Sequence, residues 1–242
     1  MSDFSVNYDF SGAQVLVTGG TSGIGAAIAS GFNEAGASVA ITGTRTSAED
    51  YENLPAGCEY YQLNLTDDEQ IDRFADNFES LDVLINNAGG NVVPEDFGTA
   101  IQLNLTSVHR ISQALHRALA AGDDWASIIN MGSMMSFKGS QHSPGYSAAK
   151  TGILSLTQSQ AAMWVGDGIR VNAIAPGAVR TPMTAGWADD ETYGPATAGM
   201  AVMNRWGQPD DMVGPVMFLC SSGAAFVTGS CLKVCGGFQI SD

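Results

Sequence analysis

The sequence predicts an α/β fold, a doubly wound, Rossmann-like parallel sheet of about seven strands in a single domain that spans residues 1–242. Short apolar runs alternate along the chain with longer stretches of helical pattern, which indicates successive βαβ units. Because these runs lack polar alternation, we expect helices on both faces of the sheet. Strands are expected at residues 14–18, 38–42, 59–63, 81–85, 126–130, 169–174 and 231–234. Helices are expected at residues 24–35, 67–78, 97–121, 147–165 and 209–221.

The length and the composition fit this architecture. The 242 residues match one large α/β domain, and the 45% hydrophobic content is ordinary for a globular protein. The chain carries 10 Lys and Arg residues against 25 Asp and Glu residues, a formal net charge of −15. Such an acidic surface repels nucleic-acid phosphates and anionic lipid, so we expect neither a nucleic-acid partner nor a membrane partner.

The cysteines and the N-terminal residues indicate a reduced, cytoplasmic protein. Cys58, Cys220, Cys231 and Cys235 form no CxxC pair, and no histidine lies at metal-ligand spacing near them, so no metal site is expected. The first residues carry acids where a signal peptide carries bases. No run reaches the ~18 apolar residues of a membrane span.

A glycine-rich turn follows the first expected strand and precedes a helix. Glycines allow a tight turn and let backbone N–H groups approach a pyrophosphate, and the helix N-terminus adds positive potential. This context predicts a dinucleotide cofactor. Its candidate contacts are Gly19, Thr21, Ser22, Gly23, Ile24 and Gly25.

The glycines have the spacing G-x-x-x-G-x-G, and further motifs follow in order along nearly the whole chain. They are Asn86-Asn87-Ala88-Gly89, Asn104, Ser133, Tyr146 with Lys150, and Pro176-Gly177 with Thr181. In order and spacing, these motifs resemble the short-chain dehydrogenase/reductase family. The resemblance implies an oxidoreductase that interconverts an alcohol and a carbonyl compound with NAD(P).

Tyr146 and Lys150 are spaced i, i+4, so they share one face of a helix. A nearby ammonium favours the phenolate, so we expect Lys150 to lower the pKa of Tyr146 from its usual value near ~10. Tyr146 is then the general acid in reduction and the general base in oxidation. Ser133 can donate a hydrogen bond to the substrate oxygen. By resemblance, Lys150 also holds the nicotinamide ribose, and Asn104 binds a water that relays protons to Lys150.

The resemblance implies further cofactor contacts. Asn87, Ala88 and Gly89 would line the adenosine side, although a glycine at a strand end can simply turn the chain. Asn64 and Leu65 stand at an adenine-contacting position that is usually acidic in the family. Thr181 resembles the residue that bonds the nicotinamide carboxamide. The same stretch supplies the other implied contacts, Pro176, Gly177 and Val179.

The end of the second strand bears on the choice of cofactor. Gly43 stands where NAD-preferring members usually place an Asp that binds the ribose 2′-hydroxyl, and Thr44 and Arg45 follow it. Since no carboxylate repels a 2′-phosphate there and Arg45 can pair with it, NADP(H) is favoured. If Arg45 is only a solvated loop cation, the cofactor is NAD(H).

The substrate side carries a weaker signal. We expect residues 181–205 to form a mobile lid, with an ordinary surface loop as the alternative. Methionine and tryptophan side chains offer an adaptable apolar wall, whereas an amide and an imidazole can bond hydroxyls or a carboxylate. The candidate substrate contacts are Met134, Met135, Gln141, His142, Met183 and Trp187.

Residues 129–137 and 205–222 resemble sugar-acid members of the family such as 2-dehydro-3-deoxygluconate 5-dehydrogenases. We therefore favour a sugar acid, polyol or similar small hydroxy compound as substrate. The overall layout also resembles 3-oxoacyl-carrier-protein reductases, which leaves thioester reduction open. A non-catalytic cofactor-binding regulatory protein, and an isomerase or dehydratase, are disfavoured because Ser133, Tyr146 and Lys150 are all present.

One departure concerns the segment that precedes Asn104. Seventeen positions separate Asn87 from Asn104, fewer than the family usually has, and the shortening can open the pocket or alter a subunit contact. By resemblance we expect a homotetramer whose interfaces include the helix at residues 147–165 and the apolar tail at residues 236–240. Core packing of these segments is the alternative.

Overall fold

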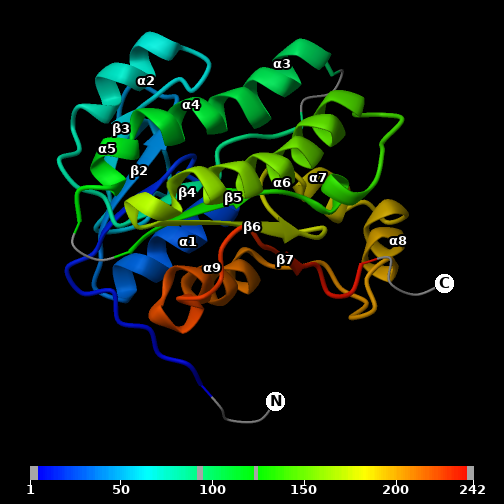
Figure 1. Ribbon diagram of the computed structural model, residues 1–242. Helices are drawn as coiled ribbons and strands as arrows, with labels where there is room; N and C mark the ends of the chain where they lie inside the picture. Colours follow the sequence, from blue (N-terminus) through cyan, green and yellow to red (C-terminus); the bar gives the residue numbers. More distant parts are fainter. Residues whose placement is uncertain (1–4, 92–94, 123–124, 239–242) are drawn as a thin grey trace.

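The computed structural model describes residues 5–91, 95–122 and 125–238. Within them, seven strands form one sheet in the order β3-β2-β1-β4-β5-β6-β7, and every neighbouring pair is parallel (Figure 1). The strands are β1 (Gln14–Val17), β2 (Ser38–Gly43), β3 (Glu59–Gln62), β4 (Val83–Asn86), β5 (Ala126–Met131), β6 (Ile169–Pro176) and β7 (Cys231–Val234). The direction of strand order reverses between β1 and β4, as in doubly wound nucleotide-binding sheets, so the predicted fold class is confirmed.

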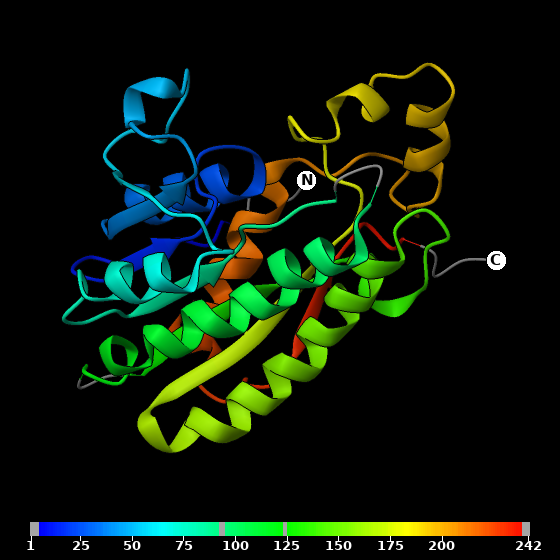
Figure 2. The same cartoon turned by 90° about the horizontal axis from the view of Figure 1, so that it is seen from above.

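Helices cover both faces of the sheet (Figures 1 and 2). Val15 and Val17 of β1 pack in one core cluster with Phe32 of α1, whereas Leu16 packs in a second cluster with Trp164 of α6. Each buried strand therefore presents apolar side chains to two helical layers. The helices are α1 (Gly23–Glu34), α2 (Asp68–Ala75), α3 (Phe97–Ile101), α4 (Ser107–Ala114), α5 (His116–Leu119), α6 (Pro144–Trp164), α7 (Ala185–Ala188), α8 (Tyr193–Gly199) and α9 (Val213–Cys220).

Three helical segments differ in detail from expectation. The helical stretch expected at residues 97–121 is confirmed over most of its length, but a π-helical turn at Gln102–Thr106 lies within it, between α3 and α4. α6 begins at Pro144, three residues before the expected start, because proline suits the first helical turn. Tyr146 consequently lies in that first turn. The segment expected as a helix at residues 209–221 begins as a 3-10 helix, Pro209–Met212, before α9.

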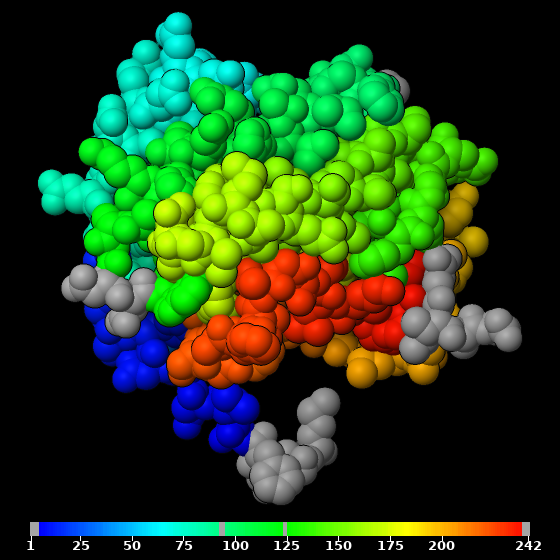
Figure 3. All heavy atoms as spheres, in the orientation of Figure 1, coloured from blue at the N-terminus to red at the C-terminus, as the bar shows by residue number. Residues whose placement is uncertain are grey.

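The segment at residues 181–205 lies outside the sheet and its two main helical layers, although Ala201 forms a β-bridge with Phe238. It contains the short helices α7 and α8, which lie beyond the arrowhead of β6 (Figures 1 and 2). On the outer surface, α6 lies beside the chain that leads into β7 (Figure 3). A Cβ atom on Gly229 would lie 3.7 Å from Cβ of Ala161, which confirms this contact. In the described part of the chain, no helix combines the length and the apolar character needed to cross a membrane.

Candidate active site

The turn between β1 and α1 has a backbone that favours glycine at several positions. Gly19 and Gly23 have φ angles of +63° and +56°, a region that other residues rarely adopt. A Cβ atom on Gly19 would lie 2.9 Å from Cα of Ala88, and one on Gly25 would overlap the side chain of Asn87. The turn is therefore packed tightly against the end of β4, and a ligand can approach its backbone closely.

The N-terminus of α1 is suited to an anion. Ser22 is the N-cap residue, but its side chain makes no capping hydrogen bond, and the first turn of α1 contains no acidic residue. The N–H groups of that turn and the positive end of the helix dipole remain available to a ligand. Together with Thr21 and Ile24, this donor set fits the pyrophosphate of a dinucleotide.

Thr18 and Asn87 join the glycine-rich turn to the end of β4. The Thr18 hydroxyl accepts hydrogen bonds from the N–H groups of Asn87 and Ala88, both at 3.0 Å. The Asn87 amide in turn donates to the carbonyl oxygens of Thr18 and Gly19, both at 3.0 Å. The contacts of the Asn87 side chain are thus made to the turn itself, and they hold its shape.

Ser133, Tyr146 and Lys150 meet beyond the end of β5. Ser133 follows β5 and caps a 3-10 helix, Met134–Phe137, by accepting from the N–H of Met135 at 3.1 Å. The Ser133 hydroxyl lies near enough to the phenol of Tyr146 to lower the pKa of that phenol. Nζ of Lys150 lies 5.6 Å from the ring centroid of Tyr146 and donates to the carbonyl oxygen of Met131 at 2.8 Å.

The ionisation of the Tyr146–Lys150 pair differs from the expectation. Burial raises the pKa of Tyr146, and the influence of Ser133 lowers it only in part. Burial also lowers the pKa of Lys150 to about 8. The prediction that Lys150 depresses the pKa of Tyr146 is therefore wrong for this structure, because burial of the phenol outweighs the influences that lower its pKa.

Asn104 lies in the π-helical turn between α3 and α4. Its side-chain oxygen accepts from the N–H of Gly90, and its amide donates to the carbonyl oxygens of Gly90 and Ala100, all at 3.0 Å. Gly89 has a φ of +151°, and a Cβ atom there would lie 2.6 Å from Oδ1 of Asn104 and 3.8 Å from Nζ of Lys150. Asn104 thus holds the 89–90 backbone close to Lys150. Single π-helical turns within α-helices are frequent at functional sites.

Glu95, which the sequence analysis missed, caps the helix that carries Tyr146. Its carboxylate accepts hydrogen bonds from the N–H groups of Gly145 at 2.6 Å and Tyr146 at 2.8 Å. The N-cap residue of α6, Ser143, makes no capping bond and instead accepts from the side chain of Asn91 at 2.7 Å. The shortened segment before Asn104 therefore docks on the start of α6. No local motif links Glu95 to residues fifty positions away, so the sequence carried no signal for this contact.

We expect Glu95→Ala to lower the free energy of unfolding by about 1–3 kcal/mol, because two N–H groups at the positive end of α6 lose a charged acceptor. Glu95→Gln keeps one acceptor oxygen and should lose less. Urea unfolding of both variants and of the wild type measures the effect. A Glu95→Ala variant as stable as the wild type would show that the cap contributes nothing.

The other implied cofactor contacts lie in the segments that follow β2, β3 and β6. The guanidinium of Arg45 lies in the loop after β2, 4.7 Å from the ring centroid of Tyr51, and Thr44 precedes it. Oδ1 of Asn64 accepts two hydrogen bonds from Thr66, at 3.1 and 2.8 Å, and is thus committed to a local turn. Leu65 beside it is buried. A Cβ atom on Gly23 would lie 3.2 Å from Thr181. The other implied contacts, Pro176, Gly177 and Val179, lie at the end of β6 and in the short segment that leads from it to Thr181.

The candidate substrate contacts differ in their exposure and surroundings. Met134 is buried, and the methyl group of Met183 lies over Gly90, where a Cβ atom would be 2.7 Å away. Gln141 and His142 are exposed and bond each other at 3.0 Å. Trp187 is 54% exposed and makes an edge-to-face contact with Trp206 at 5.9 Å. Met135, next to Ser133, is partly buried.

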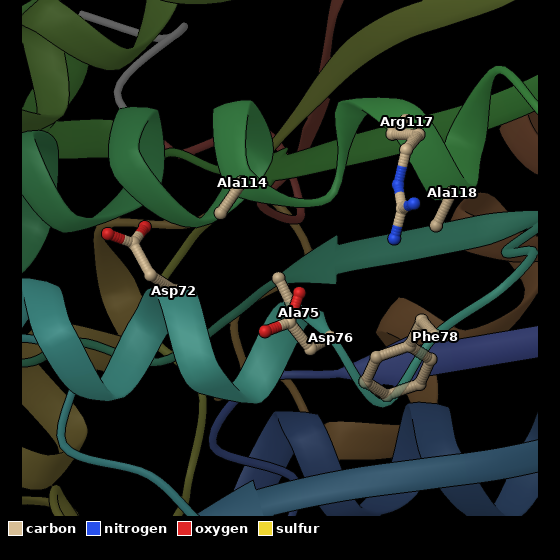
Figure 4. Close-up of a pocket in the computed structure, with 7 residues that line it drawn as sticks. All are labelled: Asp72, Ala75, Asp76, Phe78, Ala114, Arg117 and Ala118. Atoms are coloured by element: carbon tan, nitrogen blue, oxygen red, sulfur yellow. The ribbon is translucent and has the colours of Figure 1, made fainter.

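Two cavities lie away from the Ser133–Tyr146–Lys150 group. Figure 4 shows one between α2 and α4–α5, and no predicted site residue lines it. Its lining residues are Asp72, Ala75, Asp76, Phe78, Ala114, Arg117 and Ala118. A second cavity lies at the ends of β6 and β7 and reaches Gly177 and Val179. Among the residues that the structure describes, no group of three or more His, Cys, Asp or Glu side chains could hold a metal ion.

The parallel sheet, the glycine-rich turn and the Ser133–Tyr146–Lys150 group define a dinucleotide-binding oxidoreductase. A family model described as "Enoyl-(Acyl carrier protein) reductase" matches residues 19–239. The chain belongs to the short-chain dehydrogenase/reductase family and is an NAD(P)-dependent oxidoreductase that acts on CH–OH groups.

Similar proteins agree with this assignment over nearly their full length. The chain is 32% identical to a 2-dehydro-3-deoxy-D-gluconate 5-dehydrogenase of Escherichia coli, with 96% of this chain and 97% of the relative covered. It is 35% identical to the 3-oxoacyl-[acyl-carrier-protein] reductase FabG of Vibrio cholerae, with 95% and 98% covered. A solved structure of a gluconate 5-dehydrogenase from Burkholderia cenocepacia, in complex with NADP and tartrate, superposes with a TM-score of 0.87 at 28% identity, with 98% of each chain covered.

Proposed function

We propose that this protein interconverts a secondary alcohol and a ketone on a sugar acid, polyol or similar small hydroxy compound, with NADP(H). The observation that carries the proposal is the grouping of Ser133, Tyr146 and Lys150, with Nζ of Lys150 5.6 Å from the centroid of the Tyr146 ring, together with a glycine-rich turn shaped for a dinucleotide. The bound nicotinamide would supply or accept the hydride.

In this proposal, the chain's own residues handle the proton and the substrate oxygen. Tyr146 gives a proton to the substrate oxygen in reduction and takes it back in oxidation. Ser133 donates a hydrogen bond to that oxygen as charge develops on it. Lys150 holds the ribose and exchanges protons with Tyr146, and Asn104 holds a water on the path to Lys150. Asn87, Ala88 and Gly89 support the cofactor from the end of β4, and Thr181 orients the carboxamide.

The printed names of the relatives support the substrate class, and they also favour a second candidate. The 2-dehydro-3-deoxy-D-gluconate 5-dehydrogenase similarity favours a sugar acid. The comparable similarity to FabG favours a 3-oxoacyl thioester. The net charge of −15 argues against the second candidate, because its acyl carrier is itself acidic and would be repelled.

A substrate panel tests the proposal. Oxidation or reduction is followed at the reduced-nicotinamide absorbance band with keto-sugar acids, polyols and 3-oxoacyl thioesters. We expect the highest kcat/KM with a sugar acid or polyol. A highest kcat/KM with a thioester would establish the second candidate, and no turnover with any carbonyl or alcohol would contradict the proposed reaction.

The preference for NADP(H) is proposed from the end of β2, where Gly43 offers no carboxylate and Arg45 offers a cation. Arg45→Ala is expected to raise KM for NADPH about tenfold, since a charge-assisted pair with the 2′-phosphate is lost, and to leave KM for NADH nearly unchanged. Steady-state kinetics with both cofactors measures this. A wild-type enzyme that strongly prefers NADH would contradict the proposal and favour the NAD(H) alternative.

The proposal also includes a cytoplasmic homotetramer with residues 181–205 as a lid over one catalytic domain, residues 1–242. Apolar side chains exposed on and near α6 and α9 favour self-association, among them Met163 at 62% and Phe226 at 105% exposure. Residues 239 and 240 of the expected interface tail lie outside the described residues. Sedimentation velocity tests the assembly, and a monomer at micromolar concentration would contradict it.

A further inference from the structure

The shortened segment before Asn104 approaches both members of the Tyr146–Lys150 pair. At its start, a Cβ atom on Gly89 would lie 3.8 Å from Nζ of Lys150. Further along, the carboxylate of Glu95 accepts a hydrogen bond from the backbone N–H of Tyr146 at 2.8 Å. One stretch of chain therefore bears on the position of both residues.

Gly145, the residue before Tyr146, has no room for a side chain against this segment. A Cβ atom on it would lie 3.0 Å from both Cβ of Ala100 and Oε1 of Glu95, and 3.1 Å from Cα of Phe97. The start of α3 therefore packs directly on the first turn of α6.

The first turn of α6 also depends on this segment for its hydrogen bonds. The first N–H groups of a helix have no partner within the helix, and the N-cap residue Ser143 makes no capping bond here. Glu95 instead accepts from the N–H groups of Gly145 at 2.6 Å and Tyr146 at 2.8 Å. Asn91 donates to the Ser143 hydroxyl at 2.7 Å, so the segment is attached to the start of α6 at two points.

Adjacent carboxylates of this segment cap two different helices. Asp96 is the N-cap residue of α3 and accepts from the N–H of Thr99 at 2.7 Å. Glu95, one residue earlier, makes its bonds to α6. Asp96 is exposed, whereas Glu95 is partly buried. Of these two caps, only the one made by Glu95 reaches the helix that carries Tyr146.

We propose that Glu95 is a positioning residue for Tyr146 and that it fixes the place of the phenol for proton transfer. Helix ends fray readily, so a first turn held by a carboxylate from outside the helix restricts where the phenol points. A displacement of about 1 Å at a reacting group can lower a rate about 10²-fold. Glu95 thus acts through Tyr146. This inference rests on the proposed role of Tyr146 as general acid and base.

The test compares kcat for the wild type, Glu95→Ala, Tyr146→Phe and the double variant, with NADPH and the carbonyl compound that the enzyme reduces fastest. We expect Glu95→Ala to lower kcat by about 5- to 30-fold. The Kd of NADPH should stay within about twofold in a fluorescence titration. In the Tyr146→Phe background, the same substitution should change the remaining kcat by less than about twofold, because the oxygen that Glu95 positions is already gone.

Asp96→Ala is the matched control, because it removes a carboxylate cap from the adjacent residue without touching α6. Its kcat should stay within about twofold of the wild type. Glu95→Gln keeps one acceptor oxygen at the same reach and should recover most of the kcat that Glu95→Ala loses. An unchanged kcat in Glu95→Ala overturns the proposal, as does an equal loss in Asp96→Ala or in the Tyr146→Phe background. Should Tyr146→Phe itself keep the wild-type kcat, the role of Tyr146 fails first, and the inference fails with it. Since the test uses ratios of kcat, any carbonyl substrate that the enzyme accepts will serve, and a wrong substrate class leaves the result intact.

Discussion

Tyr146→Phe is expected to lower kcat by about 10²–10⁴-fold, the usual contribution of a positioned general acid or base. The substitution removes one oxygen from a partly buried ring near Ser133, and the helix and its Glu95 cap remain. The contacts of the glycine-rich turn do not involve this oxygen, so NADPH binding should be largely retained. Steady-state kinetics gives kcat, and a fluorescence titration with NADPH gives the Kd of the cofactor.

Tyr8→Phe serves as the control for this substitution. Its ring packs near Phe10 at 6.3 Å, on a part of the chain that precedes β1, so kcat should not change. A Tyr146→Phe enzyme with near-wild-type kcat would remove Tyr146 from the chemistry. A loss of both kcat and NADPH binding would show that the variant disturbs the cofactor site rather than the proton transfer.

Lys150→Met is expected to change the pH dependence of both activity and stability. Burial lowers the pKa of Lys150 to about 8 in the folded protein, so Lys150 loses its proton near that pH. Alcohol oxidation needs the pair to accept a proton, so kcat/KM for oxidation should rise through about pH 8 in the wild type. In the variant the rise should move to higher pH, because burial raises the pKa of Tyr146 and no ammonium is left to share a proton.

The difference in stability between the wild type and Lys150→Met should change with pH in a definite direction. Between the folded pKa of about 8 and the ordinary value of 10.5, the unfolded chain holds a proton on Lys150 that the folded chain does not. The free energy of unfolding of the wild type, relative to Lys150→Met, should therefore rise with pH across that window, by about 1.4 kcal/mol per pH unit at most. Below pH 8 the cost of the buried charge is fully present. Urea unfolding at pH 7, 9 and 10 measures it, and a pH-independent difference would contradict a lysine that is buried with a lowered pKa.

The two substitutions separate two origins of lost activity. Tyr146→Phe removes the group that touches the substrate oxygen. The pH dependence of the remaining activity should still be set by Lys150. Lys150→Met removes the neighbouring charge and should shift that pH. If both variants showed the same unshifted profile, the inflection near pH 8 would belong to another group.

Most of the fold could be predicted because it depends on short-range patterns. Buried parallel strands leave continuous apolar runs such as 83–86, and all seven expected strands exist with ends that move by three residues or fewer. The glycine-rich turn could be predicted because positive φ angles at Gly19 and Gly23 select glycine directly in the sequence. The i, i+4 spacing of Tyr146 and Lys150 placed both on one face of α6.

The helical stretch expected at residues 97–121 is confirmed over most of its length, but the π-helical turn within it was missed, because apolar periodicity does not register one extra residue in a turn. The π-helical turn at Gln102–Thr106 inserts that residue and brings the Asn104 side chain onto Gly90. Contacts such as Glu95 with Tyr146, or Asn91 with Ser143, join residues that no motif connects. Only the folded chain brings them together.

The amino-acid sequence by itself determined the doubly wound parallel class of the sheet and the position of the glycine-rich turn, because both depend on local conformation and spacing. The resemblance of its motifs to a known family pointed to Ser133, Tyr146 and Lys150. The tertiary structure alone decided how these groups ionise and which side chain caps the helix that carries Tyr146. A pKa depends on how much water the whole surrounding fold removes, and that quantity is a sum over neighbours from many segments, so it cannot be assigned from the spacing of two residues on one helix.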